Sequence, residues 1–291
     1  MIHSFRTLAV GIAFASLSLV GAFAQQDFSK VEIKVTQVSD HIYMLEGSGG
    51  NIAVSAGPDG VLIVDTQFAP LSPKIEAAIE KLGKGKAKYV LNTHWHGDHT
   101  GGNVNFGKYA DIIANANVKK RLQSAAKPAP AEALPKITFD DKWTTKFNGE
   151  EIRMVHMGPG HTDGDSYVYF TGSKVIHMGD QFVNKRFPFI DLTSGGSVEG
   201  YAKNLGDVLK TVPADLKVIP GHGPLGTTDD IKTMQSMLQE SVDLVKTSIK
   251  DGKTLEQIKA AGLPAKFKDW SGGFMGGDRW LQITYNSLTQ K

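Results

Sequence analysis

The feature that most restricts the fold of this chain is a dense run of histidine and aspartate directly after a short apolar segment. Tyr89-Val90-Leu91 is followed within a few residues by His94, His96, Asp98 and His99. Alternate side chains of an extended segment point the same way, so the first two histidines can bind one cation. The glycine after His96 permits a sharp turn that directs Asp98 and His99 to a second position.

Imidazole and carboxylate groups at this density predict a zinc site. An aspartate ligand favours a catalytic site over a closed structural one. The alternative is a polar loop or a surface histidine cluster that binds metal adventitiously. The spacing directly after a strand favours the zinc site.

Four segments together resemble the motifs of the metallo-β-lactamase superfamily. His94-x-His96-x-Asp98-His99 resembles the signature of that family. Three later segments resemble, in family order, its third histidine loop, its bridging-carboxylate turn and its last histidine loop: Gly158–Asp165, His177–Asp180 and Pro220–Gly223. The similarity spans roughly residues 28–227, and four short motifs in order are specific.

The resemblance implies a role for each candidate ligand. One zinc ion is expected at His94, His96 and His161, a second at Asp98, His99 and His222, with Asp180 bridging both. We therefore expect two Zn²⁺ per chain. Asp65 closes a buried apolar strand, Val61–Val64. It is interpreted either as an outer hydrogen-bond partner of a ligand histidine or as a cap on the following loop.

Asp180 departs from the best-known clinical β-lactamases, which have cysteine or serine at this turn. Aspartate there resembles glyoxalase II, lactonases and many unassigned hydrolases. A carboxylate can bridge two metal ions, whereas a thiolate would bind one. A simple turn-capping role for Asp180 is the alternative.

The resemblance implies a zinc-dependent hydrolase. Two zinc ions lower the pKa of a bound water toward neutrality. The resulting metal-bound hydroxide, oriented by Asp98, would open a cyclic amide (a β-lactam) or a related ester, with antibiotic resistance as one conceivable role. The alternatives are a lactonase or a glyoxalase II-like thioesterase and, outside the enzymes, a non-catalytic metal-binding protein.

The substrate pocket is marked less strongly in the sequence. Lys185 and Arg186 follow the bridging aspartate and can hold a substrate carboxylate, or they are solvent-exposed charges. The lysine that clamps β-lactams in the cysteine subclass would fall near Val183 and is not matched. The remaining histidines of the mature chain, His41 and His156 with His177, are interpreted as structural.

Residues 1–24 are typical of a secretory signal peptide. Arg6 supplies the positive region, residues 8–20 are apolar, and Ala22-Phe23-Ala24 fits a cleavage site. The expected location is therefore periplasmic or secreted. An uncleaved membrane anchor is the alternative, but no second apolar stretch of spanning length follows. No stable membrane insertion is expected after cleavage.

Composition restricts the partners. The chain has 32 Lys and Arg against 30 Asp and Glu, and the signal removes Arg6 and no acid, so the mature chain is formally +1. Such a balance gives no reason to expect a nucleic-acid partner, and a small-molecule substrate is expected instead. The sequence contains no cysteine, so an exported fold must be held by its core and its metals. It does not determine the oligomeric state.

Hydrophobic periodicity predicts a mixed α/β fold, which the resemblance refines to a four-layered αββα sandwich. Residues 25–250 are assigned to the hydrolase domain and 251–291 to a C-terminal helical tail packed on it by Trp270, Phe274, Met275 and Trp280. Helices are expected at Ser72–Leu82, Asn117–Ser124, Val198–Leu209 and Thr228–Lys250, the last capped by Thr228 or Asp229. Strands are expected at Val31–Thr36, Ile42–Leu45, Ile52–Val54, Val61–Val64, Tyr89–Leu91, Asp111–Ala114, Ile137–Phe139, Thr144–Phe147, Ile152–His156, Ser166–Phe170, Lys174–His177 and Leu216–Ile219.

Overall fold

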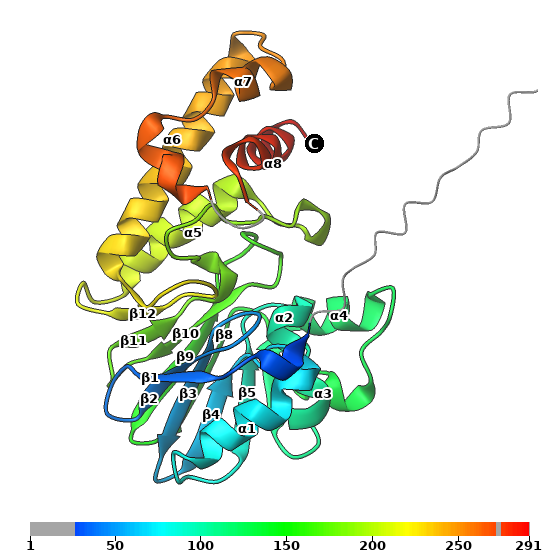
Figure 1. The fold of residues 1–291 in the computed structure, drawn as a ribbon, viewed down its shortest axis with the longest axis vertical. Coiled ribbons are helices and arrows are strands. Elements are labelled where there is room, and N and C mark those ends of the chain that lie inside the picture. Colours follow the sequence, from blue (N-terminus) through cyan, green and yellow to red (C-terminus); the bar gives the residue numbers. More distant parts are fainter. Residues whose placement is uncertain (1–26, 272–274, 291) are drawn as a thin grey trace, which may run out of the picture.

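The computed structural model describes residues 27–271 and 275–290, which build two β-sheets packed face to face (Figure 1). The first sheet has the order β1 to β7, and the second runs β13-β12-β11-β10-β9-β8. The first comprises β1 Lys34–Gln37, β2 Ile42–Glu46, β3 Ile52–Gly57, β4 Gly60–Val64, β5 Ala87–Asn92, β6 Asp111–Asn115 and β7 Ile137–Phe139. The second comprises β8 Lys142–Phe147, β9 Glu150–His156, β10 Ser166–Phe170, β11 Val175–His177, β12 Lys217–Ile219 and β13 Gly226–Thr227.

The central strands of the first sheet are buried on both faces. Neighbours β1 to β4 pair antiparallel, and β4 to β7 pair parallel. Because side chains alternate along a strand, Leu62 and Val64 join the cluster between the sheets, while Val61 and Ile63 join the cluster under the helices. This explains the continuous apolar run in β4, and the expectation that this strand is buried is confirmed.

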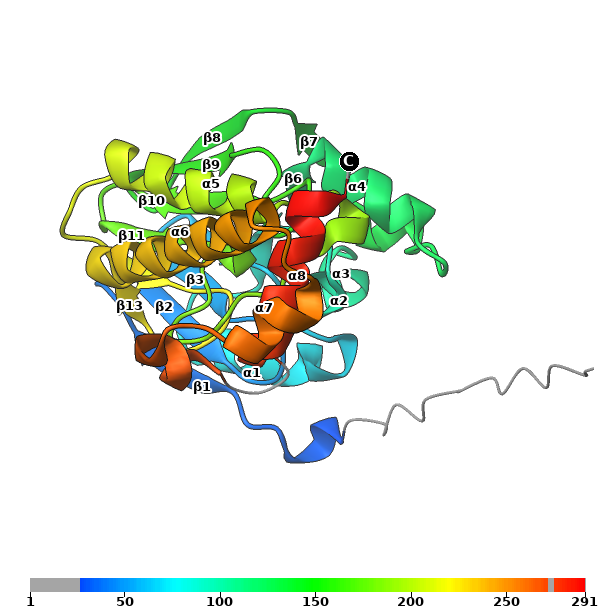
Figure 2. The ribbon, with the colours of Figure 1, turned by 90° about the horizontal axis from the view of Figure 1, so that it is seen from above.

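Helices cover the outer face of each sheet. α1 (Ser72–Glu80) and α3 (Asn103–Phe106) contribute to the apolar cluster on the first sheet. α5 (Val198–Thr211) and α6 (Thr228–Lys250) contribute to the cluster on the second (Figure 2). The layer order is helix, sheet, sheet, helix, so the expected αββα sandwich is confirmed. The remaining helices are α2 Gly97–Thr100, α4 Ala116–Ser124, α7 Leu255–Ala261 and α8 Gly277–Thr289, with 3₁₀ turns η1 Phe28–Lys30, η2 Ala69–Leu71, η3 Ala131–Ala133, η4 Gly179–Gln181, η5 Leu192–Ser194 and η6 Ala265–Trp270.

The first strand begins later than expected. The expected range was Val31–Thr36, but β1 starts at Lys34 and is preceded by the 3₁₀ turn η1. The ammonium group of Lys74 accounts for the difference, because it donates to the carbonyl oxygens of Phe28, Ser29 and Val31 at 3.1, 2.6 and 2.7 Å. These carbonyls bind a side chain instead of a neighbouring strand.

The N-cap of α6 also differs from the expectation, because Thr227 occupies it in place of Thr228 or Asp229. The Thr227 hydroxyl accepts from the backbone N–H of Asp230, whose carboxylate accepts from the backbone N–H of Thr227, as in a capping box. Thr228 instead donates to the carbonyl of Ala214. A short strand not expected from the sequence, β13, pairs with β12 just before this cap.

Beyond residue 250 the described chain forms α7, η6 and α8, and α8 packs against α5, α6 and α7. Trp280 and Met275 are buried, and Trp270 is partly buried against the same cluster. The expected signal at residues 1–24 and the predicted packing of Phe274 lie outside the described residues. No helix within residues 27–271 or 275–290 is long and apolar enough to cross a membrane.

Candidate metal centre

The candidate ligands lie where strands of both sheets end, at one edge of the sandwich. The loop after β5 delivers His94 and His96, and α2 carries Asp98 and His99. The second sheet supplies the other three: His161 after β9, Asp180 after β11 and His222 after β12. Ligands more than a hundred residues apart in the sequence therefore meet because the two sheets pack face to face.

The first ligand group consists of His94, His96 and His161, each with one nitrogen within 4.8 Å of the others. The Nδ1 atom of His96 lies 2.8 Å from Nε2 of His161. Burial lowers the pKa of both His94 and His161, which favours the neutral form that binds metal. The buried Nε2 of His94 makes no hydrogen bond with any described residue, as expected for a nitrogen that faces a cation.

The second group consists of Asp98, His99 and His222. The Nε2 atom of His222 lies 3.2 Å from Oδ2 of Asp98 and 3.4 Å from Nε2 of His99. Burial alone would raise the pKa of Asp98, but the positive charge of His99 outweighs it and the pKa falls to about 2. Burial alone would lower the pKa of His222, but the negative charge of Asp180 outweighs it and the pKa rises to about 9. The carboxylate in this group is therefore ionised at neutral pH.

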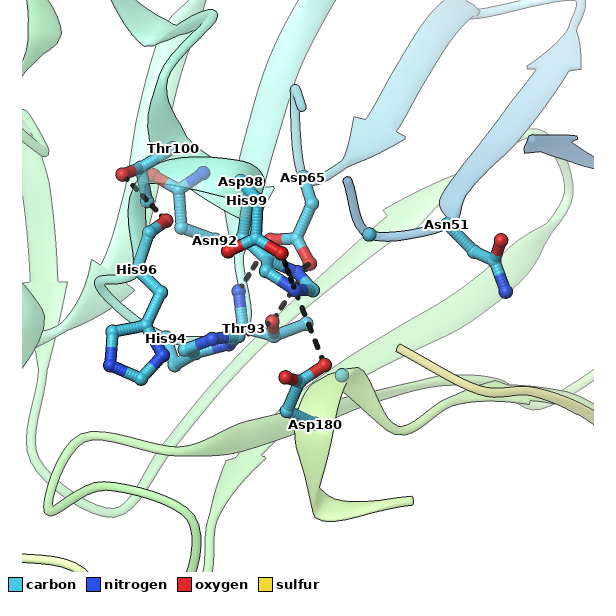
Figure 3. A network of polar contacts seen from close by, with 12 residues as sticks. Asn51, Asp65, Asn92, Thr93, His94, His96, Asp98, His99, Thr100 and Asp180 are labelled. Carbon is cyan, nitrogen blue, oxygen red and sulfur yellow. Dashed lines mark hydrogen bonds and ion pairs between the residues drawn. The ribbon is translucent and has the colours of Figure 1, made fainter. Parts of the chain in front are cut away.

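Asp180 lies within reach of histidines from both groups, and Figure 3 shows its carboxylate facing His99. Its Oδ1 atom is 3.2 Å from Nε2 of His99 and 3.4 Å from Nε2 of His222, and its Oδ2 atom is 3.5 Å from Nε2 of His161. A Cβ atom at Gly221 would overlap Asp180 Oδ1, so only glycine fits beside this carboxylate. The position suits a bridging ligand.

The donor set fits two divalent cations. It comprises five imidazoles and two carboxylates, and the sequence contains no cysteine that could add a thiolate. Nitrogen and oxygen donors of this kind suit zinc, and a carboxylate between two groups can bind both cations. The structure thus brings together all seven ligands proposed from the sequence.

Asp65 contacts the His99 ring at Nδ1, the nitrogen that does not face the other ligands (Figure 3). Its Oδ2 accepts from Nδ1 of His99 at 2.8 Å and from the Thr93 hydroxyl at 2.8 Å, and its Oδ1 accepts from the Thr93 backbone N–H at 2.8 Å. The backbone of Asp65 has φ 66°, a left-handed conformation that places its carboxylate under α2. These contacts favour the outer-partner interpretation of Asp65, which fixes the ring orientation of a ligand histidine.

Two further outer partners were not identified from the sequence. Oδ2 of Asp191 lies 3.0 Å from Nε2 of His96, and the carbonyl of Phe189 accepts from Nδ1 of His161 at 2.6 Å. Burial alone would raise the pKa of Asp191, but its hydrogen bonds with His96 and nearby hydroxyls outweigh burial and lower it. A backbone carbonyl has no sequence signature, and no motif links Asp191 to a histidine 95 residues earlier.

Asp165 was part of a recognised motif but had no assigned role. It is buried, and its carboxylate accepts from the Thr162 backbone N–H at 2.7 Å and from the Gln181 amide at 2.5 Å. It therefore ties the loop of His161 to the turn that carries Asp180. Its place four residues after His161 is the sequence signal that could have indicated this role.

The two groups face a cleft of about 640 Å³. Its apolar walls include Phe68, Val183, Phe187 and Phe189, and Ser48 and Gly49 of the β2–β3 loop line its rim. Arg186 also lines the cleft. Lys185, proposed beside it as a substrate contact, does not, and instead lines a separate depression. The side chains of Arg186 and Lys185 therefore line two different hollows, although the residues are adjacent in the sequence.

The other three histidines of the described residues lie outside both ligand groups. Nε2 of His41 is 2.7 Å from the Glu150 carboxylate, and Nδ1 of His156 is 2.7 Å from the Asp165 carbonyl. His177 is buried with Nε2 2.9 Å from the carbonyl of Asn51. Each ring thus has a hydrogen-bond partner outside the ligand groups, in agreement with a structural role.

Comparison with known proteins agrees with this geometry. The family model described as Metallo-beta-lactamase superfamily matches residues 45–222. The chain is 24% identical to a Metallo-beta-lactamase type 2 from Bacteroides fragilis over 80% of this chain and 97% of that protein. It is 29% identical to an Atrochrysone carboxyl ACP thioesterase from Emericella nidulans over 58% of this chain and 55% of that protein.

A solved structure shares the fold. The Metallo-beta-lactamase from Pontibacter korlensis superposes with a TM-score of 0.62 at 19% identity, over 72% of this chain and 99% of that one. The family match covers more than half of the chain and includes all four ligand loops. This chain therefore belongs to the metallo-beta-lactamase superfamily and is an enzyme of the hydrolase class.

Proposed function

We propose that this chain is a periplasmic di-zinc hydrolase that opens a β-lactam or a related cyclic amide. The observation that carries the proposal is the position of Asp180, within 3.5 Å of nitrogens from both ligand groups and in the lining of an apolar cleft. The location rests on the signal-like residues 1–24 of the sequence.

The chain offers one place for each cation. His94, His96 and His161 would hold one zinc ion, Asp98, His99 and His222 the other, and Asp180 would contact both. Bound there, the ions would supply Lewis acidity toward a carbonyl and would lower the pKa of water. The outer partners Asp65 and Asp191 contact Nδ1 of His99 and Nε2 of His96, which leaves the other nitrogen of each ring for a cation.

Asp98 has a second task in this proposal. Its side chain is 29% exposed and lines the cleft, whereas the His99 ring beside it is fully buried. With a pKa near 2 it is an ionised acceptor at neutral pH. Asp98 can therefore accept a hydrogen bond from a water in the cleft and orient it toward a substrate carbonyl.

The walls of the cleft indicate the kind of substrate. Phe68 and Phe189 present apolar surface, and Arg186 adds a guanidinium that can pair with a carboxylate. A small molecule with an apolar body and one carboxylate beside the scissile bond matches this lining. β-Lactams have that chemistry.

A second candidate is a lactonase or thioesterase. Two observations favour it: an aspartate stands at position 180 in place of the cysteine or serine of β-lactamase subclasses, and one similar protein is a thioesterase. Opening of a β-lactam, a lactone or a thioester begins in each case with attack of water on a carbonyl, and the three reactions differ in the leaving atom, which is nitrogen, oxygen or sulfur. The same Asp98 and cleft would serve each.

A hydrolysis panel on the zinc-loaded protein tests the proposal. Penicillins and cephalosporins are expected to be opened measurably, well below the diffusional ceiling of about 10⁸–10⁹ M⁻¹s⁻¹. The controls are chelator-treated protein and Asp98→Asn, which keeps the side-chain volume but removes the charge. Lactone or thioester turnover with no β-lactam opening would select the second candidate. Full metal occupancy without turnover of any substrate in the panel would overturn both candidates.

A further inference from the structure

The segment 186–191, between the Asp180 turn and α5, forms one wall of the candidate site. It contacts the first ligand group at three points. The Asp191 carboxylate lies 3.0 Å from Nε2 of His96, the Phe189 carbonyl is 2.6 Å from Nδ1 of His161, and the Asp191 N–H donates to the His161 carbonyl at 2.9 Å. The position of this segment therefore sets the positions of two ligand rings.

This segment has little regular structure of its own. Residues 187–191 form neither helix nor strand, so no ladder of backbone hydrogen bonds holds them. The Phe189 ring lies 6.3 Å from the His96 ring and 6.0 Å from the His161 ring, centroid to centroid. Any displacement of the segment would therefore change the surroundings of both histidines.

Trp270, Arg279 and Trp280 of the C-terminal part of the chain contact this segment. The indole of Trp280 in α8 stacks on the Phe187 ring with 5.9 Å between centroids and 8° between planes. The Phe187 N–H donates to the carbonyl of Trp270 at 3.1 Å. The Arg279 guanidinium lies 5.8 Å over the Phe189 ring. In Figure 1, α8 lies beside α5 and α6, in the helical layer that covers the second sheet.

Trp280 is the centre of these contacts. Its side chain is fully buried and belongs to the apolar cluster that contains Phe187 and Tyr201. Removal of the indole would leave a cavity directly behind Phe187, and the segment could relax into it. Because hydrogen bonds depend steeply on distance and angle, a small relaxation would weaken the bonds of Asp191 and Phe189 to the ligand rings.

We infer that Trp280 is a positioning residue for the first ligand group, acting through Phe187 on Asp191 and Phe189. The inference rests on the proposed metal binding. It predicts that α8 affects the cation held by His94, His96 and His161 and leaves the other cation unaffected. The reason is that Asp65, the outer partner of the second group, follows β4 of the first sheet, whereas α8 packs against α5 and α6 on the second.

Chelator competition on the zinc-loaded mature chain tests the inference, with binding of each of the two zinc equivalents as the readout. In Trp280→Ala one equivalent is expected to bind at least about tenfold more weakly, as when an outer partner of a ligand is lost, while the other is retained. Trp280→Phe, which keeps an aromatic ring against Phe187, should restore most of the affinity. Arg279→Ala removes an exposed contact to Phe189 and should weaken the same equivalent to a smaller extent.

Leu281→Ala is the matched control. Leu281 is the buried neighbour of Trp280 on α8, but it packs in a separate cluster with Val245 and Ile258. Its truncation opens space in that separate cluster and not behind Phe187, so both zinc equivalents should bind as in the wild type.

Two results would overturn the inference alone: wild-type binding of both equivalents in Trp280→Ala, or an equal loss in Leu281→Ala. If Trp280→Ala does not fold, Arg279→Ala decides, because weaker binding of one equivalent supports the inference and unchanged binding overturns it. A wild-type chain that binds no zinc would overturn the proposed function, and the inference with it.

Discussion

At the scale of single residues, Asp180 is a candidate ligand that contacts histidines of both ligand groups. It faces His99 and His222 with one oxygen and His161 with the other, at 3.2 to 3.5 Å. Asp180→Asn keeps the shape but exchanges a negative oxygen for an amide donor. We expect loss of one zinc equivalent and a fall in turnover larger than the roughly 10–100-fold effect of losing an outer partner.

His177→Gln is the matched control for that substitution. His177 is three residues away and buried, and its ring contacts the Asn51 carbonyl, which a glutamine amide can also reach. Zinc analysis and turnover of both variants check the prediction. Equal losses in the two variants would show that Asp180 is not the bridging residue.

Asp65 gives a second prediction at this scale. Its carboxylate accepts from His99 and Thr93, so Asp65→Asn would direct an amide N–H or a weaker acceptor at Nδ1 of His99. We expect roughly 10–100-fold weaker binding of the zinc equivalent held by His99, with the first group retained. Competition against a chelator, followed for each equivalent, measures this. Unchanged affinity would leave Asp65 only its role as a cap on the Thr93 backbone.

At the scale of elements, the N-terminus of α6 depends on one capping box. Thr227→Ala removes the hydroxyl that satisfies the Asp230 N–H, and we expect a loss of about 1 kcal/mol in the free energy of unfolding. Thr233→Ala, the same exchange at an exposed position inside α6, should change it by less than about 0.5 kcal/mol. Urea denaturation of the metal-loaded protein compares the two. Equal midpoints would contradict the capping role.

Elements whose partners lie nearby in the sequence were predictable, and those fixed by distant side chains were not. β7 and β10 match their expected bounds because apolar alternation and turn residues define them locally. β1 does not, because Lys74 binds the carbonyl of Val31, the first residue of the expected strand, which would otherwise be available for pairing. The cap of α6 was displaced by one residue because a Thr-x-x-Asp box competes with two other acceptable caps nearby.

The same distinction applies to the candidate site. The seven ligands sit in short motifs, since each needs a strand end, a glycine and a donor within a few residues. Asp191 and the carbonyl of Phe189 reach their histidines only through tertiary packing, so the sequence carried no signal for either. Arg186 and Lys185 are adjacent and both positively charged, so the sequence does not show which of them faces the substrate. The course of the backbone places Arg186 in the cleft and Lys185 outside it.

At the scale of the whole molecule, bound cations should contribute to stability because both sheets supply ligands. Zinc at about 100 times its dissociation constant adds about 2.7 kcal/mol per site, and each kcal/mol shifts Tm by roughly 2–4 °C at this chain length. We therefore expect chelation to lower Tm by about 5–10 °C for one site and more for two. Calorimetry with and without chelator, and then with zinc restored, measures the shift. An unchanged Tm would mean that the ligand groups are as stable empty as filled.

The course of the chain between the sheets has a practical consequence. Within the described residues the backbone passes from one sheet to the other once, at the exposed pair Asp140 and Asp141 between β7 and β8. Four ligands precede this crossing and three follow it. A chain cut there would yield two fragments, each with an unfinished coordination sphere and one bare side of the shared apolar interior. Reassembly would require both fragments and a divalent cation at the same time. Enzymatic turnover of the split protein would therefore report that all three are present together.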